Sequence, residues 1–136
     1  MAIVADIMSS KVAYIPDSYC LRKARAAMKN LSVRHLPVVD DNGSLVGILT
    51  QRGILAEVIK LVDLVGVSNL QHEEQNISVK AVMNTDFQII QPSTDLKLAG
   101  KYFLENKHSC LPVVEQGCLV GIVTSQDFVK LCVQLL

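Results

Sequence analysis

The sequence contains one ordered series of motifs twice. Leu-Pro-Val-Val at 36–39 recurs at 111–114, and Val-Gly-Ile at 46–48 recurs at 120–122, followed both times by a threonine two residues later. Ordered matches at a nearly constant spacing indicate that one structural unit has been duplicated. Whatever this chain folds into must therefore be built from two copies of a small element pattern.

The two copies define the expected domain organisation. We expect a first domain at 1–65, a linker at 66–78 and a second domain at 79–136. The linker is polar and shows no periodicity, which indicates a solvated segment. A copy of about 60 residues is only marginally able to form its own core. The copies are therefore predicted to pack against each other with pseudo-twofold symmetry.

Hydrophobic spacing predicts the order strand, helix, strand, strand, helix in each copy, which is an α/β fold. Leu21, Ala24, Met28 and Leu31 fall on one helical face in the first copy, and Leu96, Ala99 and Phe103 do so in the second. The expected extended and helical segments of the first copy are 12–15, the helix carrying Leu21, 35–39, 45–49 and 51–65. Those of the second copy are 87–90, the helix carrying Leu96, 111–114, 118–123 and 125–136.

Composition excludes several classes of function. With 13 basic and 13 acidic residues the formal net charge is zero, which argues against nonspecific nucleic-acid binding. No apolar run approaches the roughly 20 residues of a membrane span. The first residues lack the basic region of a signal peptide, so we expect a cytoplasmic protein. The four cysteines form no C-x-x-C pair and the three histidines are widely spaced, so no metal site is expected.

The end of the second copy carries the most suggestive local pattern. The apolar run 119–123 ends at Thr124, and a carboxylate, Asp127, follows three residues later at the start of the last predicted helix. One interpretation is that Thr124 and Asp127 cap this helix. The other is ligand binding, because a helix start suits a phosphate and a nearby carboxylate can accept hydrogen bonds from a ribose diol.

With these motifs in hand, the chain resembles a tandem pair of cystathionine-β-synthase (CBS) domains. The resemblance covers nearly the whole chain. It rests on Asp-Ile-Met-Ser at 6–9, Leu-Pro-Val-Val-Asp at 36–40 and Val-Gly-Ile-Leu-Thr at 46–50, together with Leu-Pro-Val-Val at 111–114 and Val-Gly-Ile-Val-Thr-Ser-Gln-Asp at 120–127. It implies two quasi-equivalent clefts between the repeats. Each could hold an adenosine-containing ligand such as AMP, ADP, ATP or S-adenosylmethionine.

The resemblance also implies which cleft is competent. The ribose–phosphate motif of the family is a glycine, apolar residues, a threonine or serine, two variable residues and an aspartate. The second copy matches it at Gly121, Thr124 and Asp127, whereas the first copy has Thr50 but carries Gly53 at the acidic position. The cleft assigned to Asp127 is therefore expected to bind, and the one assigned to Gly53 to be empty or weaker.

Further ligand contacts follow from the same resemblance. In this family the first segment of one copy completes the site of the other, which brings Met8, Val12 and Ala13 toward the adenine. Ser109 and Cys110 precede the second Leu-Pro-Val-Val strand and could face the nucleotide. Arg34 holds the matching place in the first copy and could reach a phosphate, which a guanidinium suits. The alternative for Arg34 is a solvated surface charge.

No arrangement of residues points to catalysis, because no nucleophile is placed with a base and no carboxylates are paired by a motif. We therefore expect a non-enzymatic module. One hypothesis is a regulatory sensor for an adenosyl nucleotide, acting on an unidentified protein partner. The other is a ligand-independent dimerisation or interaction scaffold. The family resemblance implies a homodimer joined through helices, for which the candidate residues are Leu55, Val58, Ile59, Val62, Val129, Val133 and Leu136.

Overall fold

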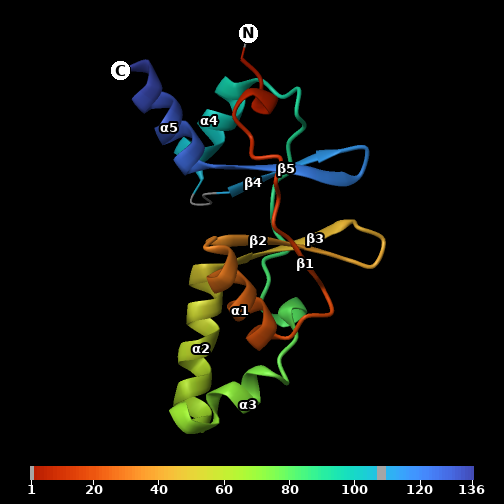
Figure 1. Ribbon diagram of the computed structural model, residues 1–136, viewed down its shortest axis with the longest axis vertical. Helices are drawn as coiled ribbons and strands as arrows, with labels where there is room; N and C mark the ends of the chain where they lie inside the picture. Colours follow the sequence, from red (N-terminus) through yellow and green to blue (C-terminus); the bar gives the residue numbers. More distant parts are fainter. Residues whose placement is uncertain (1, 107–109) are drawn as a thin grey trace. The chain divides into compact units, whose positions relative to one another are not determined.

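The chain forms two compact units that do not coincide with its two sequence repeats (Figure 1). The computed structural model describes residues 2–106 and 110–136. One unit is Met1–Val12 together with Gln88–Leu136, and the other is Ala13–Phe87. The amino-terminal segment of the first repeat is thus part of the unit formed by the second repeat.

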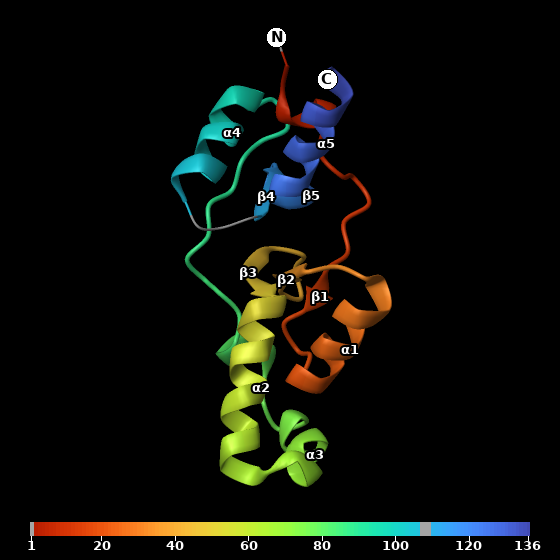
Figure 2. The same ribbon diagram turned by 90° about the vertical axis from the view of Figure 1, so that its left-hand side faces the viewer.

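The unit Ala13–Phe87 contains a three-stranded sheet in the order β1-β2-β3. Strand β1 (Ile15–Pro16) runs parallel to β2 (His35–Val39), and β2 pairs with β3 (Leu45–Thr50) as an antiparallel hairpin. Helices α1 (Leu21–Leu31) and α2 (Gln51–Val65) lie side by side in both views (Figures 1 and 2). The predicted bounds of β2 and α2 are confirmed, but the strand expected at 12–15 is reduced to two residues.

Helix α1 buries most of its predicted apolar face. Leu21, Ala24 and Met28 belong to the core of this unit, whereas Leu31 is 51% exposed. Leu31 is the last residue of the helix, and Ser32 follows it with a left-handed backbone, so the chain turns away before that side chain can be covered. The expectation that Leu31 is a core residue is therefore wrong.

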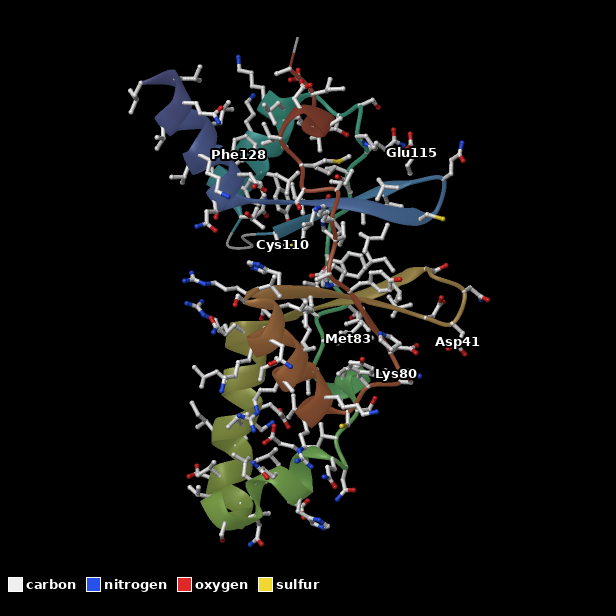
Figure 3. All side chains as sticks on the ribbon, in the orientation of Figure 1. Asp41, Lys80, Met83, Cys110, Glu115 and Phe128 are labelled. Carbon is white, nitrogen blue, oxygen red and sulfur yellow. The ribbon has the colours of Figure 1, made fainter. Side chains whose placement is uncertain are left out.

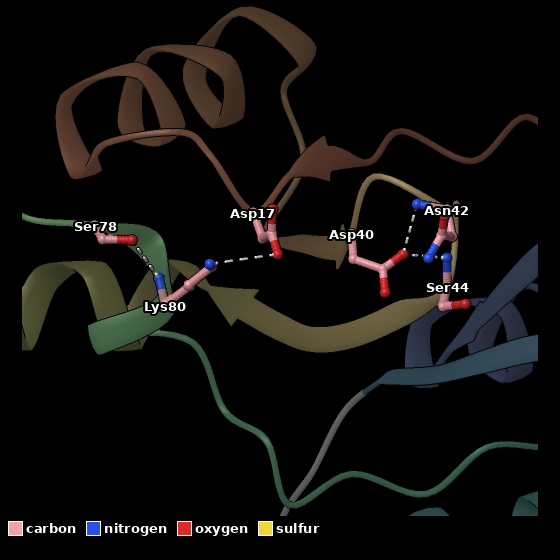
Figure 4. A network of polar contacts seen from close by, with 6 residues as sticks. All are labelled: Asp17, Asp40, Asn42, Ser44, Ser78 and Lys80. Atoms are coloured by element: carbon pink, nitrogen blue, oxygen red, sulfur yellow. Dashed lines mark hydrogen bonds and ion pairs between the residues drawn. The ribbon is translucent and has the colours of Figure 1, made fainter.

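Side-chain hydrogen bonds stabilise the turns around the sheet. Asp40 Oδ1 accepts from the backbone N–H groups of Asn42 and Ser44, both at 2.9 Å (Figure 4). This fixes the hairpin turn that the Asp-Asn-Gly sequence predicts, with Gly43 at a φ of +81°. Met83 lies near Lys80, below the sheet (Figure 3). The Lys80 ammonium forms an ion pair with the Asp17 carboxylate, with 3.7 Å between Nζ and Oδ2.

The segment 66–78 is not the solvated linker that its polar sequence predicts. It contains the short helices η2 (Val67–Asn69) and α3 (Leu70–Glu74), and Leu70 and Ile77 pack against the core. Glu74 is fully buried and accepts hydrogen bonds from Nε and Nη2 of Arg25 on α1, each at 2.7 Å. The expectation failed because the residue that pairs with Glu74 is 49 positions away in the sequence. The repeat boundaries at 1–65 and 79–136 stay predictions.

The second unit joins the amino-terminal segment to the second repeat. Its elements are η1 (Val4–Asp6), α4 (Leu96–Glu105), β4 (Cys110–Glu115), β5 (Cys118–Thr124) and α5 (Ser125–Leu135). Strands β4 and β5 form an antiparallel hairpin, and the strand expected at 87–90 is reduced to one bridge between Ile90 and Val113. The core of this unit is Val4, Ala99, Leu111, Val113 and Val123. Since Val4 is a member of it, the amino-terminal segment is an integral part of this unit.

Two absences apply to residues 2–106 and 110–136. Within these ranges no helix is both long and apolar enough to cross a membrane. The same ranges contain no group of three or more His, Cys, Asp or Glu side chains arranged to hold a metal ion.

Candidate functional site

Asp127 lies where strand β5 gives way to helix α5. Thr124 ends the strand in an extended conformation, and the helix begins at Ser125. Asp127 Oδ2 accepts a hydrogen bond from the backbone N–H of Thr124 at 2.8 Å, and the Thr124 hydroxyl lies 3.4 Å from the same oxygen. The capping interpretation of these two residues is therefore confirmed.

The Asp127 carboxylate can accept further hydrogen bonds while it caps the helix. An ionised carboxylate has two oxygens and about four lone-pair sites. The cap occupies Oδ2, and within residues 2–106 and 110–136 no hydrogen bond engages Oδ1. The side chain is half-buried rather than turned freely into solvent. A diol could be accepted by the same carboxylate while the cap persists.

Cys110 lies beside Thr124 and Asp127. It is the first residue of β4 (Figure 3) and pairs directly with Thr124 across the hairpin. Its side chain is buried. Burial, and secondarily the negative charge of Asp127, raises the pKa of the Cys110 thiol to about 12. The thiol is thus neutral and acts as a small apolar surface next to the carboxylate.

We expect Cys110 to resist alkylation by iodoacetamide at pH 8 while the exposed Cys118 and Cys132 react, because the thiolate is the nucleophile. Peptide mass spectrometry after timed labelling measures this, and labelling in urea is the control. Since folding raises the pKa of Cys110, its neutral form adds stability below about pH 9.0 that is lost as the pH rises toward 12. Equal labelling of Cys110 and Cys118 in the folded protein would contradict the assignment.

Met8 is held on the same hairpin by the amino-terminal segment. Ser9 and Ile122 exchange two backbone hydrogen bonds, of 3.0 and 3.1 Å. A Cβ atom added to Gly121 would lie 2.7 Å from Met8 Sδ and 3.1 Å from the Ser9 carbonyl oxygen, so glycine is needed there for close approach. The structure thus brings Met8 together with the strand that ends at Thr124, as the family resemblance implied.

The other residues expected at the site are divided between the two units. Val12 ends the amino-terminal segment of the same unit, whereas Ala13 packs against the core of the unit Ala13–Phe87. Arg34 also belongs to that unit, where its side chain is exposed and its carbonyl accepts from the N–H of Gln51 at 2.9 Å. Ser109 lies outside the described residues.

The first repeat has the same local geometry without the acid. Thr50 caps α2 by accepting from the N–H of Gly53 at 2.9 Å, and no carboxylate stands at position 53. His35 pairs with Thr50 across the hairpin, in the place that Cys110 holds opposite Thr124. Burial, and then the positive charge of Arg34, lowers the pKa of His35. The two repeats therefore offer an acidic site and a site without a carboxylate.

Sequence reasoning had not recognised that His35 and Cys110 lie opposite the two capping threonines. The register of the two hairpins contains this information. When the strand residues are paired outward from each turn, residue 35 lies opposite residue 50 and residue 110 lies opposite residue 124. Each pair marks the strand ends that flank a helix start. The two equivalent positions carry different side chains, so register alone predicts that the two sites differ chemically.

Two α/β repeats define the class of protein. Each repeat has a hairpin that carries a glycine and ends at a helix preceded by a threonine cap. Residues 4–60 and 79–134 match the family model of the CBS domain, so this chain belongs to the CBS domain family. It is 30% identical over 127 residues to the CBS domain-containing protein YhcV of Bacillus subtilis, a match that covers 93% of this chain and 83% of that protein. The chain spans 42% of the uncharacterized protein MJ1225 of Methanocaldococcus jannaschii and 24% of a homoserine O-acetyltransferase of Methanococcoides burtonii.

Solved structures of CBS pairs have the same fold. CBSX2 of Arabidopsis thaliana in complex with AMP is 28% identical, with a TM-score of 0.82 over 99% of this chain and 98% of that chain. The CBS domain pair of protein MJ0100, in complex with 5′-methylthioadenosine and S-adenosyl-L-methionine, is 25% identical, with a TM-score of 0.78 over 96% of this chain and 99% of that chain. Both of these similar proteins hold adenosine-containing ligands.

Proposed function

We propose that this chain is a non-catalytic regulatory module that binds an adenosine-containing ligand through its second repeat. Support comes from the assembly of Met8, Cys110, Thr124 and Asp127 around one hairpin, and from the AMP and S-adenosyl-L-methionine complexes of similar CBS pairs. The observation that carries the proposal is the half-buried Asp127 carboxylate, whose Oδ1 stays available while Oδ2 caps the helix.

Each residue has a distinct role in this proposal. Asp127 accepts the ribose hydroxyl groups, and Thr124 and the start of α5 lie near the phosphate, where helix N–H groups favour negative charge. Met8 and the neutral Cys110 thiol supply apolar surface for the adenine, with Val12, Ala13 and Ser109 as further contacts. Arg34 contributes a guanidinium for phosphate. AMP, ADP, ATP and S-adenosylmethionine are the candidate ligands.

A ligand regulates only if it binds two arrangements of the protein with different affinity. Here the amino-terminal segment leaves the first repeat and joins the second, so a ligand on Met8 and Asp127 touches parts of both sequence repeats. Binding would stabilise the attachment of this segment to β5. An unidentified protein partner that senses the segment would then respond to the ligand.

A ligand-independent scaffold is the second candidate, and exposed apolar side chains favour it. On α2, Leu55 and Ile59 are each 57% exposed, and on α5 Val129 and Val133 are 59% and 67% exposed. These positions are four residues apart, so each pair lies on one helix face. We propose that these faces form a homodimer, which sedimentation equilibrium tests directly: a monomer at all concentrations would contradict it.

Isothermal titration with AMP, ATP and S-adenosylmethionine tests the sensor proposal, with GMP as the control for the base. We expect one site per chain and a thermal stabilisation that grows with ligand concentration, about 2.7 kcal/mol at 100 times the dissociation constant. If no adenosyl compound binds or raises the melting temperature, the sensor proposal is wrong and the scaffold stands.

A further inference from the structure

A groove lies between α1 and α2 in the unit Ala13–Phe87. Its volume is about 520 Å³, within the range of roughly 300–1,000 Å³ that is common for small-molecule sites. Apolar side chains form part of its lining, and they are Met28, Val33, Ile54, Leu55 and Val58. The polar lining residues are Arg25, Lys29, Ser32, Arg34 and Gln51.

The charge of this α1–α2 groove is one-sided. Its lining contains three basic residues, and none of its lining residues is acidic. Glu74 neutralises Arg25 from below through two hydrogen bonds of 2.7 Å. Among the residues that the structure describes, no ion pair engages Lys29 or Arg34. Two cationic groups therefore remain at the groove in a chain whose formal net charge is zero.

The second repeat provides an internal comparison at the equivalent positions that the structure describes. A Cβ atom added to Gly100 would lie 3.3 Å from the ring of Phe128, and the rings of Phe103 and Phe128 are 5.5 Å apart. Counted by the repeat, the positions of Arg25, Met28, Lys29 and Ile54 correspond to Gly100, Phe103, Leu104 and Phe128. At these described positions the second repeat thus has a glycine and a leucine where the groove on α1 and α2 has Arg25 and Lys29.

Two backbone N–H groups at the start of α2 are already engaged. The N–H of Gln51 donates to the Arg34 carbonyl and the N–H of Gly53 donates to Thr50 Oγ1, both at 2.9 Å. An anion at this end of the groove would therefore be held by side chains. The Lys29 ammonium and the Arg34 guanidinium, with the Ser32 hydroxyl and the Gln51 amide, supply donors above an apolar floor.

We propose that the α1–α2 groove binds a small amphipathic anion, an acyl or aryl body that carries one carboxylate or phosphoryl group. The apolar body packs on Ile54 and Met28, and the anionic head lies at Lys29 and Arg34. The groove is formed within the unit Ala13–Phe87; Arg34 is also named for the proposed nucleotide site, and Leu55 for the proposed homodimer face.

Titration of the labelled full chain with octanoate, octyl phosphate and octanol, followed by ¹H–¹⁵N NMR, tests the proposal. We expect saturable shifts at the amides of residues 29–33 and 51–55 with one or both anions, and much weaker shifts with octanol. Lys29→Leu installs the residue that stands at the equivalent position in the second repeat. It is expected to weaken anion binding at least about tenfold, as the loss of one hydrogen bond between charged groups would. Lys60→Leu, an exposed lysine on α2 outside the groove, is the matched control and should change nothing.

Several outcomes would overturn the proposal. These are equal binding of octanol, shifts outside the groove, unchanged affinity in Lys29→Leu, or no shifts up to about 10 mM ligand, which corresponds to negligible affinity. Shifts that depend only on protein concentration would show that a second copy covers the groove instead. AMP titration of Lys29→Leu separates the two sites: unchanged AMP binding is expected, so either proposal can fail without the other.

Discussion

Replacement of Arg25 by methionine is expected to lower the free energy of unfolding by about 3–5 kcal/mol, because it leaves a buried carboxylate without its partner. Glu74 is fully buried, and within the described part of the chain both hydrogen bonds to its carboxylate come from Arg25. Methionine keeps the apolar stem of the arginine and is a good helix former, so the loss of charge dominates. This is a large share of the 5–15 kcal/mol that stabilises a typical domain.

The reverse change should cost less. Glu74→Ala leaves the arginine unpaired, but the Arg25 side chain is 43% exposed and its guanidinium can be hydrated. We expect a loss of about 1–2 kcal/mol from this variant. The double variant Arg25→Met/Glu74→Leu replaces the pair by apolar groups, which is often neutral for a buried ion pair, and should recover most of the stability.

Urea unfolding, monitored by circular dichroism, measures these differences. Arg22→Met is the matched control, because Arg22 is an exposed arginine on the same helix and surface substitutions usually change stability by about 0.5 kcal/mol or less. If Arg25→Met costs no more than Arg22→Met, the pair does not anchor α3. If the double variant is as unstable as Arg25→Met, the lost packing of the arginine stem is the cause instead.

The Arg25–Glu74 pair also shows where prediction from the sequence ended. Local patterns gave β2, α2 and the two hairpins, since a short apolar run bounded by turn residues and a threonine cap are recognisable within a few residues. The segment around Glu74 has no such pattern. Its helix has five residues, and its buried carboxylate is explained only by an arginine on another element.

The residues of the candidate site also fall into those that the sequence predicts and those that only the tertiary structure explains. Thr124 and Asp127 follow from local capping rules, and Met8 was expected beside the second repeat because of the family resemblance. Cys110 was named for its place before a strand, but its neutral state depends on burial and on the nearness of Asp127, which only the tertiary structure gives. The groove on α1 and α2 was not predicted, because Lys29 and Arg34 are ordinary surface charges until the fold places them over one apolar floor.

Asp127→Ala is expected to weaken AMP binding by about 100-fold, since hydrogen bonds to a charged group contribute about 1.5–3 kcal/mol each and 1.4 kcal/mol is a factor of ten. Alanine also removes the cap on Thr124, and loss of a cap costs about 0.5–2 kcal/mol of stability. A change in binding could therefore reflect a frayed helix α5. The alanine variant alone does not separate capping from ligand binding.

Asp127→Asn makes that separation. The asparagine carbonyl can still accept from the N–H of Thr124, so the melting temperature should stay near that of the wild type. The other side-chain group of asparagine is an NH₂ donor, which cannot accept a hydrogen bond from a ribose hydroxyl group. AMP binding should therefore weaken by at least about tenfold. Calorimetric titration of both variants measures this, and wild-type affinity in the asparagine variant would show that the carboxylate serves only as a cap.

Gly53→Asp tests the same principle in the opposite direction. The added Cβ would lie 3.1 Å from Thr50 Oγ1, a tight contact that a shift of the Thr50 side chain by a few tenths of an ångström would relieve. The variant gives the first repeat the Thr-x-x-Asp pattern of the second, and we expect the stoichiometry of AMP binding to rise from one to two per chain. A folded variant that still binds one AMP would mean that His35, opposite Thr50 where the second repeat has Cys110, also distinguishes the two sites. The triple comparison of wild type, Gly53→Asp and Gly53→Asp/His35→Cys then assigns the difference between the repeats to the acid, to the histidine or to both.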